Sequence, residues 1–140
     1  MSRRISTLLV SNLYLSVTSK TLLSSVLDAA SARTPDSKTR LVGAFTDKVY
    51  GRSSLHFTST DTECLRGTLN SVIAVAEGGK GGGYEAEGGG DTAHPAFGGA
   101  VDNLSVCQLE PEGGTEHARE VARGVEVDGE KVYYGWGGGG

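Results

Sequence analysis

The hydrophobic pattern in the first half of the chain changes its period from segment to segment, and this change restricts the fold most. Residues 5–16 have a period of two, with Leu9, Leu13 and Leu15 on one face, which predicts a strand. After Ser19, a candidate helix cap, the apolar residues follow a helical spacing. This stripe consists of Leu22, Leu23, Val26, Leu27 and Ala30. The chain therefore opens with a strand followed by a helix.

A second unit repeats strands and then a helix. Residues 39–45 and 53–60 read as strands joined across residues 47–52. Thr60 and Glu63 have the spacing of a capping box, which predicts that the next helix starts at Thr60. Its expected buried stripe is Leu65, Leu69, Val72, Ile73 and Ala76.

Glycine dominates residues 78–90, and the pattern of ordered elements stops there. We expect a mobile loop, because such a segment buries too little to offset its conformational entropy. The alternative is a phosphate-binding loop, but the segment lacks the glycine-lysine motif of such loops. Order is expected to return with a strand over residues 100–109, a helix capped by Thr115 and a strand over residues 132–134.

The predicted order is β-α-β-β-α-β-α-β, which makes residues 1–140 one α+β domain with a flexible tail at residues 136–140. The first six elements are typical of a ferredoxin-like β-α-β-β-α-β sheet with helices on one face, here extended by a further α-β. Such a sheet leaves its other face for solvent or for a partner.

The composition is that of an ordinary soluble protein, and we expect a cytoplasmic location. Charged residues make up 21% of the chain and the net charge is −4, so there is no basic surface to attract nucleic acid. No apolar run approaches the roughly 20 residues that cross a bilayer, so no membrane partner is expected. Residues 1–27 contain no acidic residue, and an organelle transit peptide is the alternative to a first strand and helix. Cys64 and Cys107 are expected to be buried, reduced and metal-free.

Histidine is the natural proton carrier near neutral pH, and the chain has three. His56 lies within a predicted strand, which predicts a surface or sheet-face position, and His117 lies within the first turn of a predicted helix, which predicts a solvated position. His94 lies between the glycine-rich segment and a predicted strand, and Pro95 restricts its backbone to extended conformations. His94 is therefore the candidate catalytic residue. No metal-ligand spacing accompanies these histidines.

The sequence His94-Pro-Ala-Phe-Gly-Gly-Ala-Val-Asp102 resembles the signature of the formiminotransferase family, in its N-terminal subdomain. Four further segments resemble that subdomain in the same order, namely residues 12–16, 47–53, 118–120 and 132–135. The resemblance covers nearly the whole chain apart from residues 78–90 and the tail.

The resemblance implies a transferase that moves a formimino group from formiminoglutamate to tetrahydrofolate, its co-substrate. By position, His94 would be the acid/base and Arg52 would hold a carboxylate of glutamate or of the folate tail. Asp47 or Asp102 would orient the imidazole or a substrate amine.

The chain departs from the family pattern at several positions. Ala96 replaces an arginine, Asp102 comes one residue late, and Gly43 and Phe45 replace an acidic pair. The 140 residues also match only the first of the two subdomains found in the full enzymes. A second hypothesis is therefore a non-catalytic module that binds folate, or that forms a homo-oligomer through its sheet face or an edge strand.

Overall fold

The computed structural model describes residues 7–32, 37–78, 100–109, 114–127 and 130–131. Its elements in chain order are β1 (Leu8–Leu15), α1 (Lys20–Ser31), β2 (Thr39–Asp47), β3 (Arg52–Ser59), α2 (Thr62–Gly78), β4 (Val101–Leu109), α4 (Glu116–Arg123), β5 (Glu126–Val127) and β6 (Glu130–Lys131). The main sheet has the order β2-β3-β1-β4, every neighbouring pair is antiparallel, and β5 and β6 form a separate two-stranded sheet. The predicted α+β class is confirmed.

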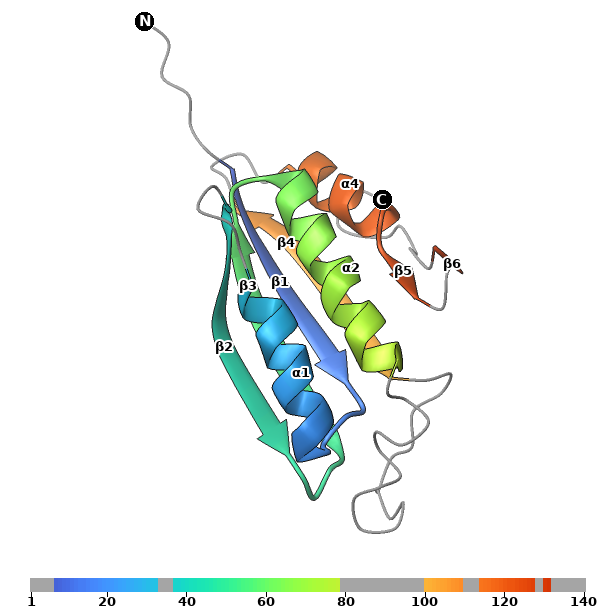
Figure 1. Cartoon of the computed structure of the whole chain (residues 1–140). Helices are drawn as coiled ribbons and strands as arrows, with labels where there is room; N and C mark the ends of the chain where they lie inside the picture. The colour runs from blue at the N-terminus through green and yellow to red at the C-terminus, as the bar shows by residue number, and fades with distance from the viewer. Residues whose placement is uncertain (1–6, 33–36, 79–99, 110–113, 128–129, 132–140) are drawn as a thin grey trace, which may run out of the picture.

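One face of the main sheet carries the helices and the core, and we call it the helix face. Figure 1 shows α1 and α2 side by side across this face, with α4 next to α2. Leu9, Leu13 and Leu15 of β1 are buried there, as the period of two predicts. They join side chains of β3 and of both long helices in one core, including Leu55, Phe57, Val26, Ala30, Leu65, Leu69, Val72, Ile73 and Ala76.

Both long helices are capped, one as predicted and one a residue later than predicted. The Ser19 side chain accepts a hydrogen bond from the Leu22 N–H at the start of α1. For α2 the predicted Thr60–Glu63 capping box is wrong, because the Asp61 side chain accepts from the Cys64 N–H at 2.9 Å. Aspartate is as good a cap as threonine, and the Thr60 N–H instead bonds to the Lys38 carbonyl.

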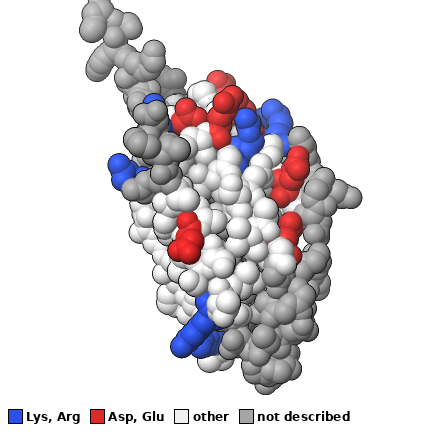
Figure 2. All heavy atoms as spheres, in the orientation of Figure 1, with Lys and Arg blue, Asp and Glu red and all other residues white. Residues whose placement is uncertain are grey.

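Two side-chain amides, those of Gln108 and Asn70, attach the C-terminal part to the rest of the domain. The Ala118 N–H at the start of α4 donates to the buried Gln108 side chain of β4, at 2.9 Å. Asn70 of α2 donates to the Gly124 carbonyl and accepts from the Glu126 N–H, both at 3.0 Å. In Figure 2 acidic and basic side chains are interspersed at this end of the molecule, whereas α1 and α2 present mostly uncharged atoms.

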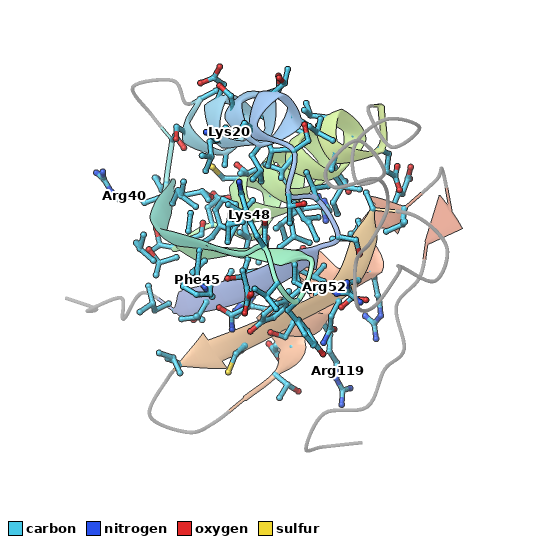
Figure 3. The ribbon with its side chains drawn as sticks, turned by 90° about the horizontal axis from the view of Figure 1, so that it is seen from below. Lys20, Arg40, Phe45, Lys48, Arg52 and Arg119 are labelled. Atoms are coloured by element: carbon cyan, nitrogen blue, oxygen red, sulfur yellow. The ribbon has the colours of Figure 1, made fainter. Side chains whose placement is uncertain are left out.

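The opposite face of the sheet, which we call the outer face, has no described helix packed on it. Figure 3, seen from below, shows the helices as a separate layer along the sheet. The register places alternate residues of each strand on the outer face, including Gly43, Phe45, Ser54, His56, Thr58, Val10, Asn12, Tyr14, Asn103, Ser105 and Cys107. Phe45 is 65% exposed there.

Both edge strands contain a β-bulge. In β2 the register shifts between Leu41 and Gly43, which leaves Val42 without a partner on β3. In β4 the register shifts where Tyr14 pairs with Asn103 and Leu15 with Val101, which leaves Asp102 unpaired. A bulge bends its strand and re-aims the extra side chain.

The cysteines are free among the described residues, but Cys107 is exposed and Cys64 only half-buried, so the expectation of two buried cysteines is wrong. Cys107 occupies an outward position of β4, where the alternation of the strand exposes any side chain. Three predicted segments lie outside the described residues: most of the glycine-rich loop, the strand over residues 132–134 and the tail. No helix in the described part of the chain is long and apolar enough to cross a membrane.

Candidate functional site

The structure brings together two of the residues that the sequence singled out, Arg52 and Asp102. Arg52 opens β3, and Asp102 is the bulged residue of β4. Both lie beside the end of β1, because Leu15 pairs with Ser53 on one side and with Val101 on the other. The Arg52 Nε donates to Asp102 Oδ2 at 2.9 Å.

Further contacts hold the Arg52 side chain, which is 12% exposed. Its Nη1 donates to the Gly51 carbonyl at 3.1 Å, and the guanidinium lies 5.5 Å from the centre of the Tyr50 ring. Attraction between a cation and an aromatic face contributes about 0.5–1 kcal/mol at exposed sites. The guanidinium fork is therefore fixed in direction at the end of the sheet.

Asp47 holds the turn that precedes Arg52. Its Oδ1 accepts from the Tyr50 N–H at 3.0 Å, and its carbonyl accepts from the Gly51 N–H at 2.9 Å. Gly51 has a φ of 81°, a conformation that other residues rarely adopt. The carboxylate of Asp47 is thus used within the turn, which places Arg52 at the start of β3.

A buried hydroxyl lies at the same end of the sheet. Ser16 directly follows β1, is 1% exposed, and its Oγ has no hydrogen-bond partner among the described residues. The Ser16 N–H donates to the Ala100 carbonyl at 2.7 Å, which ties the end of β1 to the entry of β4. His94 lies outside the described residues. The Arg52–Asp102 pair and Ser16 together form the junction, a name we use for the polar groups at this end.

A second polar group lies at the centre of the outer face and was missed by sequence reasoning. His56 Nδ1 lies 2.6 Å from Asn12 Oδ1, and His56 Nε2 lies 3.1 Å from Ser54 Oγ. Asn12 Nδ2 in turn donates to Ser105 Oγ at 3.5 Å. We call these four residues the outer-face row; it crosses β4, β1 and β3. The Tyr14 ring meets His56 edge-on, with 6.5 Å between ring centres.

The prediction that His56 lies on a sheet face is correct, but its partners could not be read from the sequence. Ser54 and His56 are two apart on one strand, a spacing that places them on the same face. Asn12 and Ser105 join them only through the register of three strands. Finding these partners requires the register between strands, which the sequence does not show.

Cys64, in the first turn of α2, has a perturbed thiol. Partial burial raises its pKa, but hydrogen bonds from the side chains of Ser37 and Thr39 and from the backbone of Lys38 and Thr39 outweigh this. The pKa of Cys64 therefore lies below the ordinary thiol value. Its sulfur is 3.5 Å from Ser37 Oγ.

Metal ligands do not gather within the described residues, where no three His, Cys, Asp or Glu side chains are placed to share an ion. The sequence matches no protein-family model, and a search of curated proteins finds no matching relative.

Proposed function

We propose that the chain is a one-carbon transfer domain of the formiminotransferase type, in which Arg52 binds a carboxylate of formiminoglutamate or of the folate tail. The observation that carries the proposal is the Arg52–Asp102 pair, which joins two segments 50 residues apart in the sequence. Both segments belong to the resemblance, because Arg52 lies in residues 47–53 and Asp102 closes the signature that starts at His94.

The proposed fold supports this assignment. We infer that the main sheet is of the ferredoxin-like class, because the strand order β2-β3-β1-β4 is antiparallel throughout and two β-α-β crossovers build it. Such a sheet brings the end of β1 next to the starts of β3 and β4, so these three strand ends deliver Ser16, Arg52 and Asp102 to one place.

Each residue has a defined role in the proposal. The guanidinium of Arg52 is a planar fork that suits two carboxylate oxygens, and Asp102 fixes its direction. The hydroxyl of Ser16, which no described residue engages, supplies a buried polar group to a ligand at the junction. His94 carries protons between the formimino group and the folate amine, and tetrahydrofolate is the co-substrate. We place the protein in the cytoplasm, where folate-dependent transfer would have its substrates.

A calorimetric titration tests the carboxylate site directly. We would titrate tetrahydrofolate and then formiminoglutamate into the wild type and into Arg52→Ala. Losing a charge-assisted hydrogen bond costs about 1.5–3 kcal/mol, so Kd should rise roughly 10–100-fold. Arg40→Ala is the matched control, because Arg40 is an exposed arginine of β2 that lies well away from Arg52 (Figure 3). Equal affinity of the Arg52→Ala protein would refute the site.

The acid/base role of His94 needs a separate measurement. His94→Ala should keep the affinity for both ligands but lose formimino transfer to tetrahydrofolate. A variant that retains turnover would remove His94 from the mechanism while leaving the binding site intact.

One observation favours the alternative, a non-catalytic module that pairs through its sheet face. The outer face carries several exposed apolar side chains, and exposed apolar surface can mark a contact site. They are Leu8, Tyr14, Val42, Phe45 and Leu109. This alternative predicts concentration-dependent dimerisation by light scattering, weakened in Phe45→Ser, together with no transfer activity.

A further inference from the structure

We propose that Ser54, His56 and Asn12 form a nucleophilic site on the outer face that transfers the acyl group of small activated esters to Ser54 and then to water. The site is separate from the junction and does not depend on the proposed folate chemistry. Its evidence is the geometry of the outer-face row: 3.1 Å between Ser54 Oγ and His56 Nε2, and 2.6 Å between His56 Nδ1 and Asn12 Oδ1.

The hydrogen bonds of the outer-face row determine which ring nitrogen of His56 carries the proton. Asn12 Nδ2 donates to Ser105 Oγ, which directs the amide oxygen of Asn12 toward the imidazole. An amide oxygen can only accept a hydrogen bond, so His56 Nδ1 carries the proton. In the neutral imidazole Nε2 then has the lone pair, and it accepts from the Ser54 hydroxyl.

This arrangement has the geometry of an activated nucleophile. A hydroxyl contacts a base, and a third group orients that base. Two hydrogen-bonded strands, β1 and β3, carry these residues, so their spacing is set by the sheet rather than by a loop. Asn12 acts through His56 and is a positioning residue, as is Ser105.

The surroundings of Ser54 indicate the substrate class. In the strand register Ser54 pairs with Tyr14 on β1 and with Phe45 on β2, so aromatic side chains lie on both sides of it. Both rings are partly exposed, at 37% and 65%. Aromatic walls favour a short acyl ester with an aryl leaving group.

The reaction balances with water as its only co-reactant. Ser54 Oγ attacks the ester carbonyl carbon while its proton passes to His56 Nε2. The carbon–oxygen bond of the ester breaks, and His56 returns the proton to the leaving aryl oxide. Water then attacks the acyl-serine with His56 as base, releasing the carboxylic acid and restoring Ser54. General-base assistance of this kind contributes about 10²–10⁴-fold, so slow turnover is expected.

The test is hydrolysis of p-nitrophenyl acetate by the full chain, measured by p-nitrophenol release and by mass spectrometry of the trapped acyl-protein. No folate is present, so the outcome is independent of the junction. Ser54→Ala and His56→Ala should each lower the rate at least tenfold. Ser24→Ala, which removes an exposed serine of α1, should leave it unchanged. The acetyl group should be found on Ser54.

The positioning role of Asn12 has its own readout. Asn12→Ala should lower the rate, whereas Asn12→Asp should restore it and move the midpoint of the pH–rate profile upward, because a carboxylate stabilises the imidazolium. Three results would overturn the proposal: acetyl groups on other residues only, a rate in Ser54→Ala equal to the wild type, or an Asn12→Asp profile that does not move.

Discussion

The two faces of the main sheet are built from the same strands but use their residues in opposite ways. On the helix face, β1 and β3 contribute Leu9, Leu13 and Phe57, which are almost wholly buried. On the outer face, the residues between them form a hydrogen-bonded polar row with exposed aromatic side chains beside it. Successive side chains of a strand point to opposite faces of the sheet. The same strand can therefore contribute both to a stable core and to a polar outer surface.

The largest expected effect on stability separates two phenylalanines on neighbouring strands, one on each face of the sheet. Phe57 is fully buried on the helix face and Phe45 is 65% exposed on the outer face. Phe57→Ala should lower the free energy of unfolding by about 3–5 kcal/mol through lost burial and the cavity left behind. Phe45→Ala should change it by about 0.5 kcal/mol or less. Urea denaturation measures both, and equal losses would contradict the assignment of the two faces.

The next largest effect on stability is expected for a pair of glycines, one in the turn before β3 and one in β2. Gly51 has a φ of 81° in the turn, so Gly51→Ala should cost about 1–2 kcal/mol. Gly43 lies on the outer face, and a Cβ there would meet His56 Cδ2 at 3.5 Å, an ordinary contact. Gly43→Ala should therefore be neutral or stabilise by up to about 1 kcal/mol, because alanine has less backbone freedom to lose. Thermal unfolding of both variants gives the comparison, and stabilisation by Gly51→Ala would count against the turn.

The junction should contribute less to stability than to binding. Arg52 and Asp102 are partly exposed, so their ion pair should stabilise the fold by about 1 kcal/mol or less. A double-mutant cycle of Arg52→Ala and Asp102→Ala, followed by urea denaturation, measures this coupling. A coupling of several kcal/mol would show that the pair is a structural element rather than a ligand site.

The smallest effect concerns Cys64, whose pKa is lowered in the folded chain. In Cys107→Ser protein, iodoacetamide should alkylate Cys64 with a pH midpoint below that of the same thiol in urea. The unfolded state holds its thiol proton to higher pH, so the Cys64 contribution to stability is fully present above the unfolded pKa. It is lost as the pH falls through the folded pKa. A native midpoint at or above the unfolded one would contradict this.

Much of the fold follows from periodicity in the sequence. The β1 alternation and the α1 stripe are strong signals over many residues, so both elements appear where they were predicted. The capping residue of α2 was placed one residue early, because both Thr60 and Asp61 are good caps and only the backbone bonds decide between them. The exposure of Cys107 depended on the register of β4, which local sequence does not encode.

The candidate sites were less predictable than the fold, because each joins residues from separate strands. Sequence reasoning selected Arg52 and Asp102 singly and assigned both to a ligand, whereas the bulge in β4 pairs them with each other. It selected Asp47 as a ligand-binding residue, and this carboxylate holds a turn. It set His56 aside, although Ser54 of the same strand and Asn12 of β1 both lie within hydrogen-bonding distance of its ring.

The bulges in β2 and β4 bear on how the protein behaves at high concentration. Both outermost strands carry a bulge, which interrupts the row of backbone donors and acceptors that each strand could offer to another chain. Irregular edge strands of this kind protect against edge-to-edge sheet growth and fibril formation. Concentrated solutions should therefore stay free of filaments, and any self-association should stop at small, closed assemblies.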